Sequence, residues 1–122
     1  MKKPLKIVYD KNKSFEVEKG YTVDNFLSSE DEMGYSIVRT HLDGRHPFMK
    51  NIRSNRTYFL LNGSGIFYFD DDKIEINSNE MLTIPKNTKY SFVGKFDCLL
   101  IDFPAFNKED DIIYNKEEYE NN

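Results

Sequence analysis

The sequence contains a single cysteine, so no disulfide can form within one chain. A chain of this kind fits a reducing compartment. The sequence also lacks any apolar stretch near the roughly 20 residues that a membrane-spanning helix needs. The lysines at its start are not followed by the apolar run of a secretory signal. From these absences we expect a soluble, cytoplasmic protein with no membrane partner.

The sequence has no excess of basic residues. It contains 17 lysines and arginines against 21 aspartates and glutamates, for a formal net charge of −4. Nucleic acids and anionic membranes both bind strongly basic faces. The charge therefore argues against nucleic acid as a partner, while it still allows a small anion to bind in a local basic pocket.

Aromatic residues are abundant, with 10 phenylalanines and 8 tyrosines among 122 residues. Strands favour aromatic side chains, and short alternating stretches separated by turn residues run from residue 35 onward. This pattern predicts one all-β domain over residues 1–122, a sandwich or a barrel. We expect a long loop over residues 43–55. The charged tail over 107–122 is expected to be either a surface helix anchored by Ile112, Ile113 and Tyr114 or a frayed end.

Two spaced motifs lie in the alternating region. The first runs through Gly44, Lys50, Ile52, Arg56 and Gly63, and the second through Asn79, Pro85, Asn87, Tyr90 and Gly94. In this spacing the chain resembles the cupin family over about residues 36–104. The resemblance implies a double-stranded β-helix, the cupin jelly-roll barrel. It also implies a homodimer, which is common in the family.

The residues in the family's metal-ligand slots depart from its pattern. These slots hold Lys50, Ile52, Arg56 and Tyr90; lysine and arginine are cations that repel a divalent metal, and isoleucine has no donor atom. The resemblance therefore implies the fold without a metal or other cofactor. A less favoured alternative places a metal on His41, His46 and an aspartate.

Turn positions that are glycine in the family are Asn79 and Asn87 here, and asparagine tolerates left-handed backbone angles. The segments IVRT (37–40), GRHP (44–47), TKY (88–90) and PAF (104–106) also resemble a poorly characterised cupin subgroup. That resemblance suggests that a tyrosine at position 90 is usual in the subgroup.

Strand alternation decides which side chains can share the barrel interior. If Arg56 points inward, Tyr58 and Leu60 point inward with it, and Tyr90 shares a face with Phe92. Alternation alone leaves open whether Arg39 and His41 or their neighbours Val38 and Thr40 point inward. We expect Arg39 and His41 to face the mouth of the barrel.

These residues predict a pocket that binds a small polar or anionic ligand, such as a sugar, a sugar phosphate or an organic acid. Arg56, with Arg39 and Lys50, would bind a carboxylate or phosphate, and Tyr58 and Tyr90 would add hydroxyls and stacking faces. The competing interpretation is that Arg56 pairs with a carboxylate such as Asp102 or Glu80 and fills the barrel, as in a non-catalytic regulatory or interaction module.

A further alternative is a sugar isomerase or epimerase that uses His41 or Tyr90 as acid and base. The sequence does not decide whether the protein is an enzyme. Cys98 lies in an apolar stretch and is expected to be a buried, inert thiol.

Overall fold

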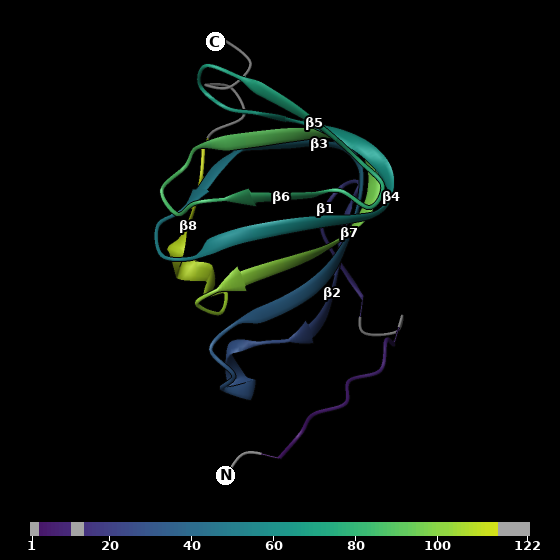
Figure 1. Ribbon diagram of the computed structural model, residues 1–122, viewed down its shortest axis with the longest axis vertical. Helices are drawn as coiled ribbons and strands as arrows, with labels where there is room; N and C mark the ends of the chain where they lie inside the picture. Colours follow the sequence, from purple (N-terminus) through teal and green to yellow (C-terminus); the bar gives the residue numbers. More distant parts are fainter. Residues whose placement is uncertain (1–2, 11–13, 115–122) are drawn as a thin grey trace.

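The computed structural model describes residues 3–10 and 14–114, and this part of the chain is built almost entirely from strands (Figure 1). In chain order the elements are β1 (Phe15–Glu18), β2 (Tyr21–Leu27), the short 3-10 helix η2 (Ser29–Asp31), β3 (Ser36–Asn51), β4 (Asn55–Tyr68), β5 (Lys73–Asn77), β6 (Met81–Ile84), β7 (Tyr90–Phe103), the 3-10 helix η3 (Lys108–Asp110) and β8 (Asp111–Ile113). The prediction of an all-β domain is confirmed. No helix within the described ranges has the length and apolar character needed to cross a bilayer.

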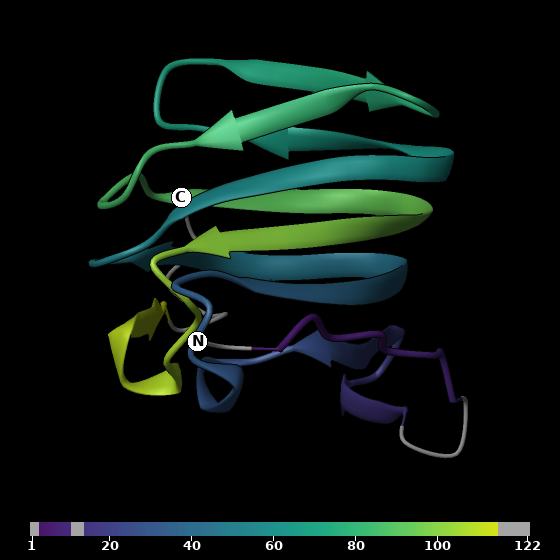
Figure 2. The ribbon, with the colours of Figure 1, turned by 60° about the horizontal axis from the view of Figure 1, so that its bottom comes forward.

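The strands form one antiparallel sheet in the order β1-β2-β3-β7-β4-β5, with β6 paired to β4 and β8 paired to β3. Three long strands, β3, β4 and β7, carry most of the pairing. β7 lies between β3 and β4 along its length, while the other edge of β3 pairs with β2 and then β8, and that of β4 with β6 and then β5. Because these strands curve strongly, the sheet wraps around an interior (Figures 1 and 2). The result is the jelly-roll barrel that the resemblance implies.

A row of glycines crosses the three long strands where they run side by side. Gly94 of β7 pairs with Gly44 of β3 on one side and with Gly65 of β4 on the other. A Cβ atom added at Gly94 would lie 2.4 Å from the backbone oxygen of Ser64, so no larger residue fits without a backbone shift. The missing side chains let the neighbouring backbones approach closely.

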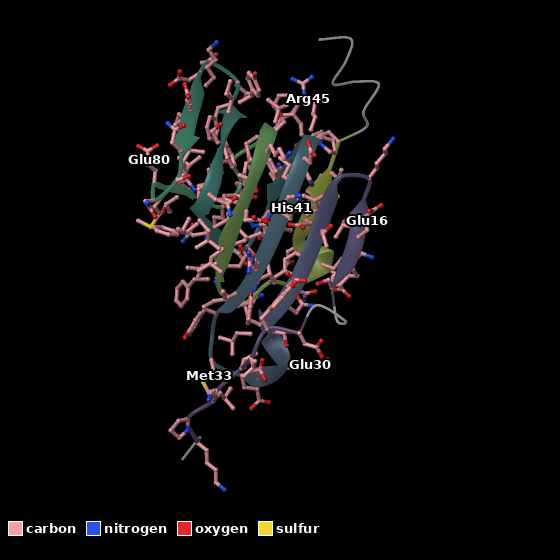
Figure 3. The ribbon with its side chains drawn as sticks, turned by 90° about the vertical axis from the view of Figure 1, so that its right-hand side faces the viewer. Glu16, Glu30, Met33, His41, Arg45 and Glu80 are labelled. Atoms are coloured by element: carbon pink, nitrogen blue, oxygen red, sulfur yellow. The ribbon has the colours of Figure 1, made fainter. Side chains whose placement is uncertain are left out.

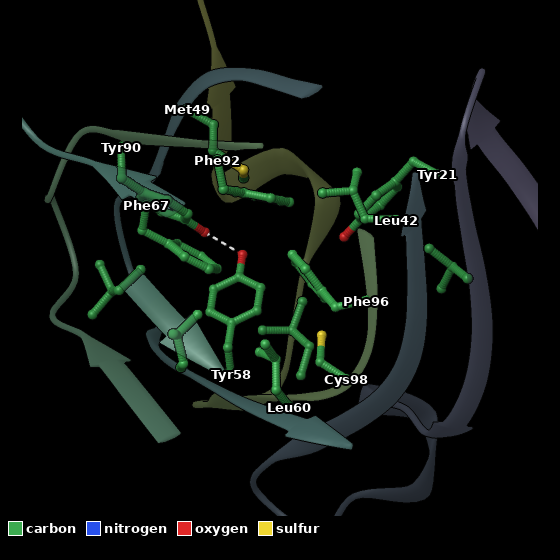
Figure 4. Packing of buried hydrophobic residues seen from close by; sticks show 14 residues of the cluster. Tyr21, Leu42, Met49, Tyr58, Leu60, Phe67, Tyr90, Phe92, Phe96 and Cys98 are labelled. Carbon is green, nitrogen blue, oxygen red and sulfur yellow. Dashed lines mark hydrogen bonds between the residues drawn. The ribbon is translucent and has the colours of Figure 1, made fainter. Parts of the chain in front are cut away.

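The core is a cluster of stacked aromatic rings inside the barrel (Figure 4). Phe67 stacks on Phe92 with ring centroids 4.9 Å apart, and Tyr58, Tyr90 and Phe96 surround this pair. All five side chains are almost fully buried. Tyr90, Phe92 and Phe96 stand at even spacings on β7, and Tyr58 and Leu60 do so on β4, as expected of inward positions. Phe67 lies nine residues after Tyr58 and shares its face because the register of β4 shifts between Leu60 and Asn62.

Two expectations about turns are confirmed and two about longer segments are wrong. Asn79 and Asn87 adopt left-handed backbone angles, with φ of 68° and 65°. The expected loop at 43–55 is instead strand through Asn51, since β3 continues past Pro47 by way of a register irregularity, where a proline can be accommodated. The segment 111–113, expected to be helical or frayed, pairs with β3 as β8. The remainder of the tail, 115–122, lies outside the described residues.

Candidate functional site

A cavity of about 440 Å³ enters the barrel beside the aromatic core. Its mouth is lined by the exposed side chains of Phe15 and Val17 on β1 and Ile113 on β8, so the cavity reaches solvent. Apolar side chains such as Tyr21, Val38 and Leu100 form much of its wall. Polar side chains along the lining include Ser36, His46, Arg56, Tyr58, Asp102 and Asp111. An apolar, open cavity with a few converging polar groups is the usual form of a small-molecule site.

Arg56 is the buried charge of this cavity, and only 3% of its surface is exposed. Its Nε and Nη2 atoms donate to the two carboxylate oxygens of Asp102, over 2.8 and 3.0 Å. Nη2 also donates to Oδ1 of Asp111 over 3.2 Å. Nη1 donates to the hydroxyl of Tyr90 over 3.2 Å and contacts the sulfur of Met49 at 3.8 Å. The guanidinium group is thus neutralised and hydrogen-bonded by residues of the chain itself.

The hydroxyls of Tyr58 and Tyr90 continue this network, with their oxygens 2.6 Å apart (Figure 4). Arginine only donates hydrogen bonds, so the Tyr90 oxygen accepts from Arg56. Burial raises the pKa of both tyrosines above the usual range. Both hydroxyls therefore keep their protons at neutral pH and can donate, and the side chain of Tyr58 reaches the cavity.

His46 also lines the cavity, buried among aromatic rings. Its ring stacks on Phe92 with centroids 4.8 Å apart and planes 8° from parallel, and it meets Tyr21 edge-on at 5.3 Å. Nδ1 lies 2.8 Å from the backbone oxygen of Pro47. A carbonyl oxygen only accepts, so Nδ1 carries a proton. In the neutral ring, the basic lone pair is then on Nε2.

The carboxylates differ in environment. Burial raises the pKa of Asp102, while the hydrogen bonds and charge of Arg56 oppose the rise. Asp111 belongs to β8 and also accepts a hydrogen bond from Asn51 over 2.8 Å, which ties the end of the described chain to β3 and to Arg56. The polar side of the cavity therefore depends on four separate strands.

No protein-family model and no curated protein sequence matches the chain. Solved structures do. A structure of Streptomyces Pac13 with uridine superposes with a TM-score of 0.77 and 22% identity, over 92% of this chain and 93% of that one. A protein from Planctomyces limnophilus gives a TM-score of 0.81 at 14% identity, over 89% and 96% of the two chains. KdgF from Halomonas sp. gives 0.71 at 12% identity, over 83% and 96%. A cupin-2 domain protein from Shewanella frigidimarina also matches, over part of the chain. This chain has the cupin fold.

The residues in the cupin metal slots lie in different places. Arg56 and Tyr90 are joined by a hydrogen bond inside the barrel, as described above. Ile52 is exposed. Lys50 follows Met49, which lines the cavity, so the alternation of β3 directs Lys50 to the other face. Within the described part of the chain, no three His, Cys, Asp or Glu side chains form a group that could hold a metal ion.

The expectation that Arg39 and His41 face the barrel mouth is wrong. Val38 lines the cavity and Thr40 is buried, so the residues between and after them, Arg39 and His41, lie on the outer face. His41 is labelled on β3 in Figure 3, and it bonds Asp97, with Nδ1 and Oδ1 2.8 Å apart. Arg39 lies over the ring of Tyr9. His41 and His46 therefore cannot share a metal ion within this cupin barrel.

The sequence also pointed to a cationic pocket, and this expectation is wrong as well. Arg56 does line the cavity, but it pairs with Asp102, as the competing interpretation supposed, and also with Asp111. Arg39 and Lys50 lie outside. Tyr58 lines the cavity, whereas Tyr90 is not on the lining and bonds the Tyr58 hydroxyl; that either tyrosine contacts a ligand stays a prediction.

Sequence reasoning missed His46 and Asp111. His46 falls in the loop expected over residues 43–55, although its odd separation from His41 places the two on opposite faces of any continuous strand. Asp111 gave no sequence signal, because its partners come from β3 and β4. Cys98 is buried and contacts Thr40, as expected of an inert thiol.

Proposed function

We propose that this protein binds a small sugar-like or nucleoside-like molecule in the barrel cavity and acts on it by proton transfer. The observation that carries the proposal is the pairing of His46 and Tyr58 on one cavity lining. His46 offers a basic Nε2 because Nδ1–H is held by Pro47. Tyr58 offers a hydroxyl that burial keeps protonated. A base and a proton donor that face one cavity are the elements of acid–base catalysis.

The reaction class that fits this pair is removal of a proton from a carbon next to a carbonyl group. Nε2 of His46 would take the C–H proton, and Tyr58 would hydrogen-bond the carbonyl oxygen, where the negative charge collects. Tyr90 would donate to Tyr58 while accepting from Arg56, which directs the Tyr58 proton into the cavity. Return of the proton to the other face of the carbon gives epimerisation, and loss of a neighbouring hydroxyl as water gives dehydration.

The structural neighbours support this choice of ligand and chemistry. Pac13 is described as a nucleoside dehydratase. The Pac13 structures with uridine are of variants in which a histidine is replaced by glutamine or a tyrosine by phenylalanine. In this chain a histidine and a tyrosine, His46 and Tyr58, line the barrel cavity.

Binding and proton transfer can be tested separately. Calorimetric titration with uridine and with uncharged sugars should detect binding, and Tyr58→Phe should weaken it by about ten-fold. In D₂O, a sugar that carries a carbonyl group should exchange its neighbouring C–H proton, and His46→Gln should abolish the exchange. The matched control is His41→Gln, since His41 lies on the outer face. Absence of binding by every uncharged sugar and nucleoside, or equal exchange in the two histidine variants, would overturn the proposal.

We also propose that the outer face of the sheet packs against a second copy of the chain. Met81 of β6 lies opposite Phe59 of β4 on this face, and Met81 is 65% exposed. An apolar hollow of about 470 Å³, lined by residues such as Leu5, Ile37 and Leu99, lies on the outside of β3 and β7. Exposed apolar patches of this kind mark protein contacts. Light scattering of the wild type and of Met81→Lys tests this arrangement.

A further inference from the structure

The charged side chains of the cavity lining are mostly acidic. They are Glu30 at the mouth, Asp102 and Asp111 inside, and Arg56 between them. The lining thus carries three carboxylates and one guanidinium group, and no lysine within residues 3–10 and 14–114 lies on it. A ligand that carries a negative charge would enter a cavity whose fixed charge has the same sign.

Arg56 has no donor left for an anionic ligand. A guanidinium group has five N–H donors. The bond of Nε to Asp102 uses one, and the bonds of Nη2 to Asp102 and Asp111 use two more. Nη1 donates to Tyr90 and contacts the sulfur of Met49. A phosphate could reach Arg56 only by displacing one of these partners, which are two carboxylates, the Tyr90 hydroxyl and the Met49 sulfur.

Other cations near the barrel are engaged on other surfaces. Lys89 lies over the rings of Phe48 and Tyr114, at 5.2 and 4.4 Å from their centroids. Arg45 lies over Tyr68 and Arg39 over Tyr9. None of the three lines the cavity. The groups on the lining that remain to donate hydrogen bonds to a ligand are neutral, with Tyr58, Asn25 and Ser29 among them.

From this arrangement we infer that the cavity selects an uncharged sugar or nucleoside and rejects its phosphorylated or carboxylated form. The inference rests on the proposed function, because it assigns a ligand class to the same cavity. It also replaces the sugar phosphate and organic acid that the sequence suggested. The acidic side chains would produce this selectivity: Asp102 and Asp111 pair with Arg56, and Glu30, which belongs to η2 (labelled in Figure 3), adds a negative charge to the lining.

The test compares uridine with uridine monophosphate by calorimetric titration at low and at physiological ionic strength. We expect the monophosphate to bind at least about ten-fold more weakly than uridine, because it brings two negative charges toward the acidic lining. Removing one carboxylate should lower the ratio of the two dissociation constants, monophosphate over uridine, by about three-fold for Glu30→Gln or Asp111→Asn. Added salt should reduce the effect of Glu30 more than that of the buried carboxylates. Glu75→Gln, on an exposed position of β5 outside the cavity, makes the same change in net charge and should leave the ratio unchanged.

The outcomes separate this inference from the proposed function. If uridine and its monophosphate bind equally, or the monophosphate binds more tightly, the inferred selectivity is wrong while ligand binding stands. If neither they nor uncharged sugars bind, the proposed function fails and the inference fails with it. If Glu75→Gln lowers the ratio as much as Glu30→Gln, the discrimination comes from net charge and not from the cavity lining, which also overturns the inference.

Discussion

His46 and His41 lie on the same strand, an odd number of residues apart, and point to opposite faces of the sheet. The inner histidine is stacked between aromatic rings, whereas the outer one is exposed and bonds Asp97. The carboxylates differ in the same way. The side chains of Arg56 and Asp102 are 4% and 3% exposed, and those of His41 and Asp97 are 48% and 22% exposed. The ion pair inside the barrel is therefore shielded from water, whereas the pair on the outer face is solvated. Removal of one partner should lower the free energy of unfolding far more inside the barrel.

The largest expected effect is on Asp102→Ala. The change leaves Arg56 buried with Asp111 as its remaining carboxylate partner, and breaking a buried pair costs about 3–5 kcal/mol of unfolding free energy. The outer counterpart, Asp97→Ala, should cost less than about 1 kcal/mol, because water replaces the lost partner. Urea denaturation of both variants measures the difference. Equal losses would show that the two faces do not differ as described.

A smaller effect is expected for Tyr90→Phe. The change removes the acceptor of Arg56 Nη1 and the partner of the Tyr58 hydroxyl, so two buried polar groups lose a hydrogen bond at a cost of about 1–3 kcal/mol. Tyr35→Phe is the matched control, since Tyr35 is 40% exposed, and should change stability by no more than about 0.5 kcal/mol. Equal losses of unfolding free energy in the two variants would contradict the hydroxyl network.

The smallest effect concerns pH and the inner thiol. Burial raises the pKa of Cys98 from 9.0 to about 11. The stability linked to this thiol is complete below the unfolded pKa of 9.0 and is lost as the pH rises toward about 11. At about pH 10, one unit above the unfolded pKa, the loss in unfolding free energy should be about 1.4 kcal/mol, and it should be absent from Cys98→Ala. On the outer face the sign is opposite: Asn62 and His41 lower the pKa of Asp97 despite its partial burial, so its contribution is lost only in acid.

The unfolding free energies of the wild type and of Cys98→Ala should be measured across the alkaline range. The difference between them separates the effect of the thiol from that of the buried tyrosines, which both proteins contain. The native thiol should also react with a thiol reagent far more slowly than the urea-unfolded chain does. Fast labelling of the native protein would show that Cys98 is accessible.

The inner face of β4 could be predicted from the sequence, and that of β3 could not. Arg56, Tyr58 and Leu60 alternate in an unbroken strand, so fixing one of them fixes the others. In β3, Gly44 and Pro47 are typical of a loop, and the pairing with β7 that keeps this segment in the sheet is a long-range contact. The facing of His46 follows from that pairing and from no local pattern.

The charge of the pocket could not be predicted for a similar reason. The sequence offered Asp102 as one partner for Arg56, but whether an arginine is free or paired depends on which strands come together. Asp111 reaches Arg56 only because β8 pairs with β3. The turns at Asn79 and Asn87 were predictable, since a left-handed angle is a property of the residue and its turn.

The bonds of Arg56 also bear on how the protein is made. Its two carboxylate partners follow it by 46 and 55 positions in the chain. A ribosome adds residues in order at about 5–20 per second, so Arg56 exists for seconds before either partner has been synthesised. During that interval a guanidinium group destined for the barrel interior has no anion to bury with it, which favours its staying in water. We therefore expect β4 to pack into the barrel interior only after β8 has left the ribosome. In a nascent chain that stalls earlier, β4 should remain accessible to chaperones and proteases.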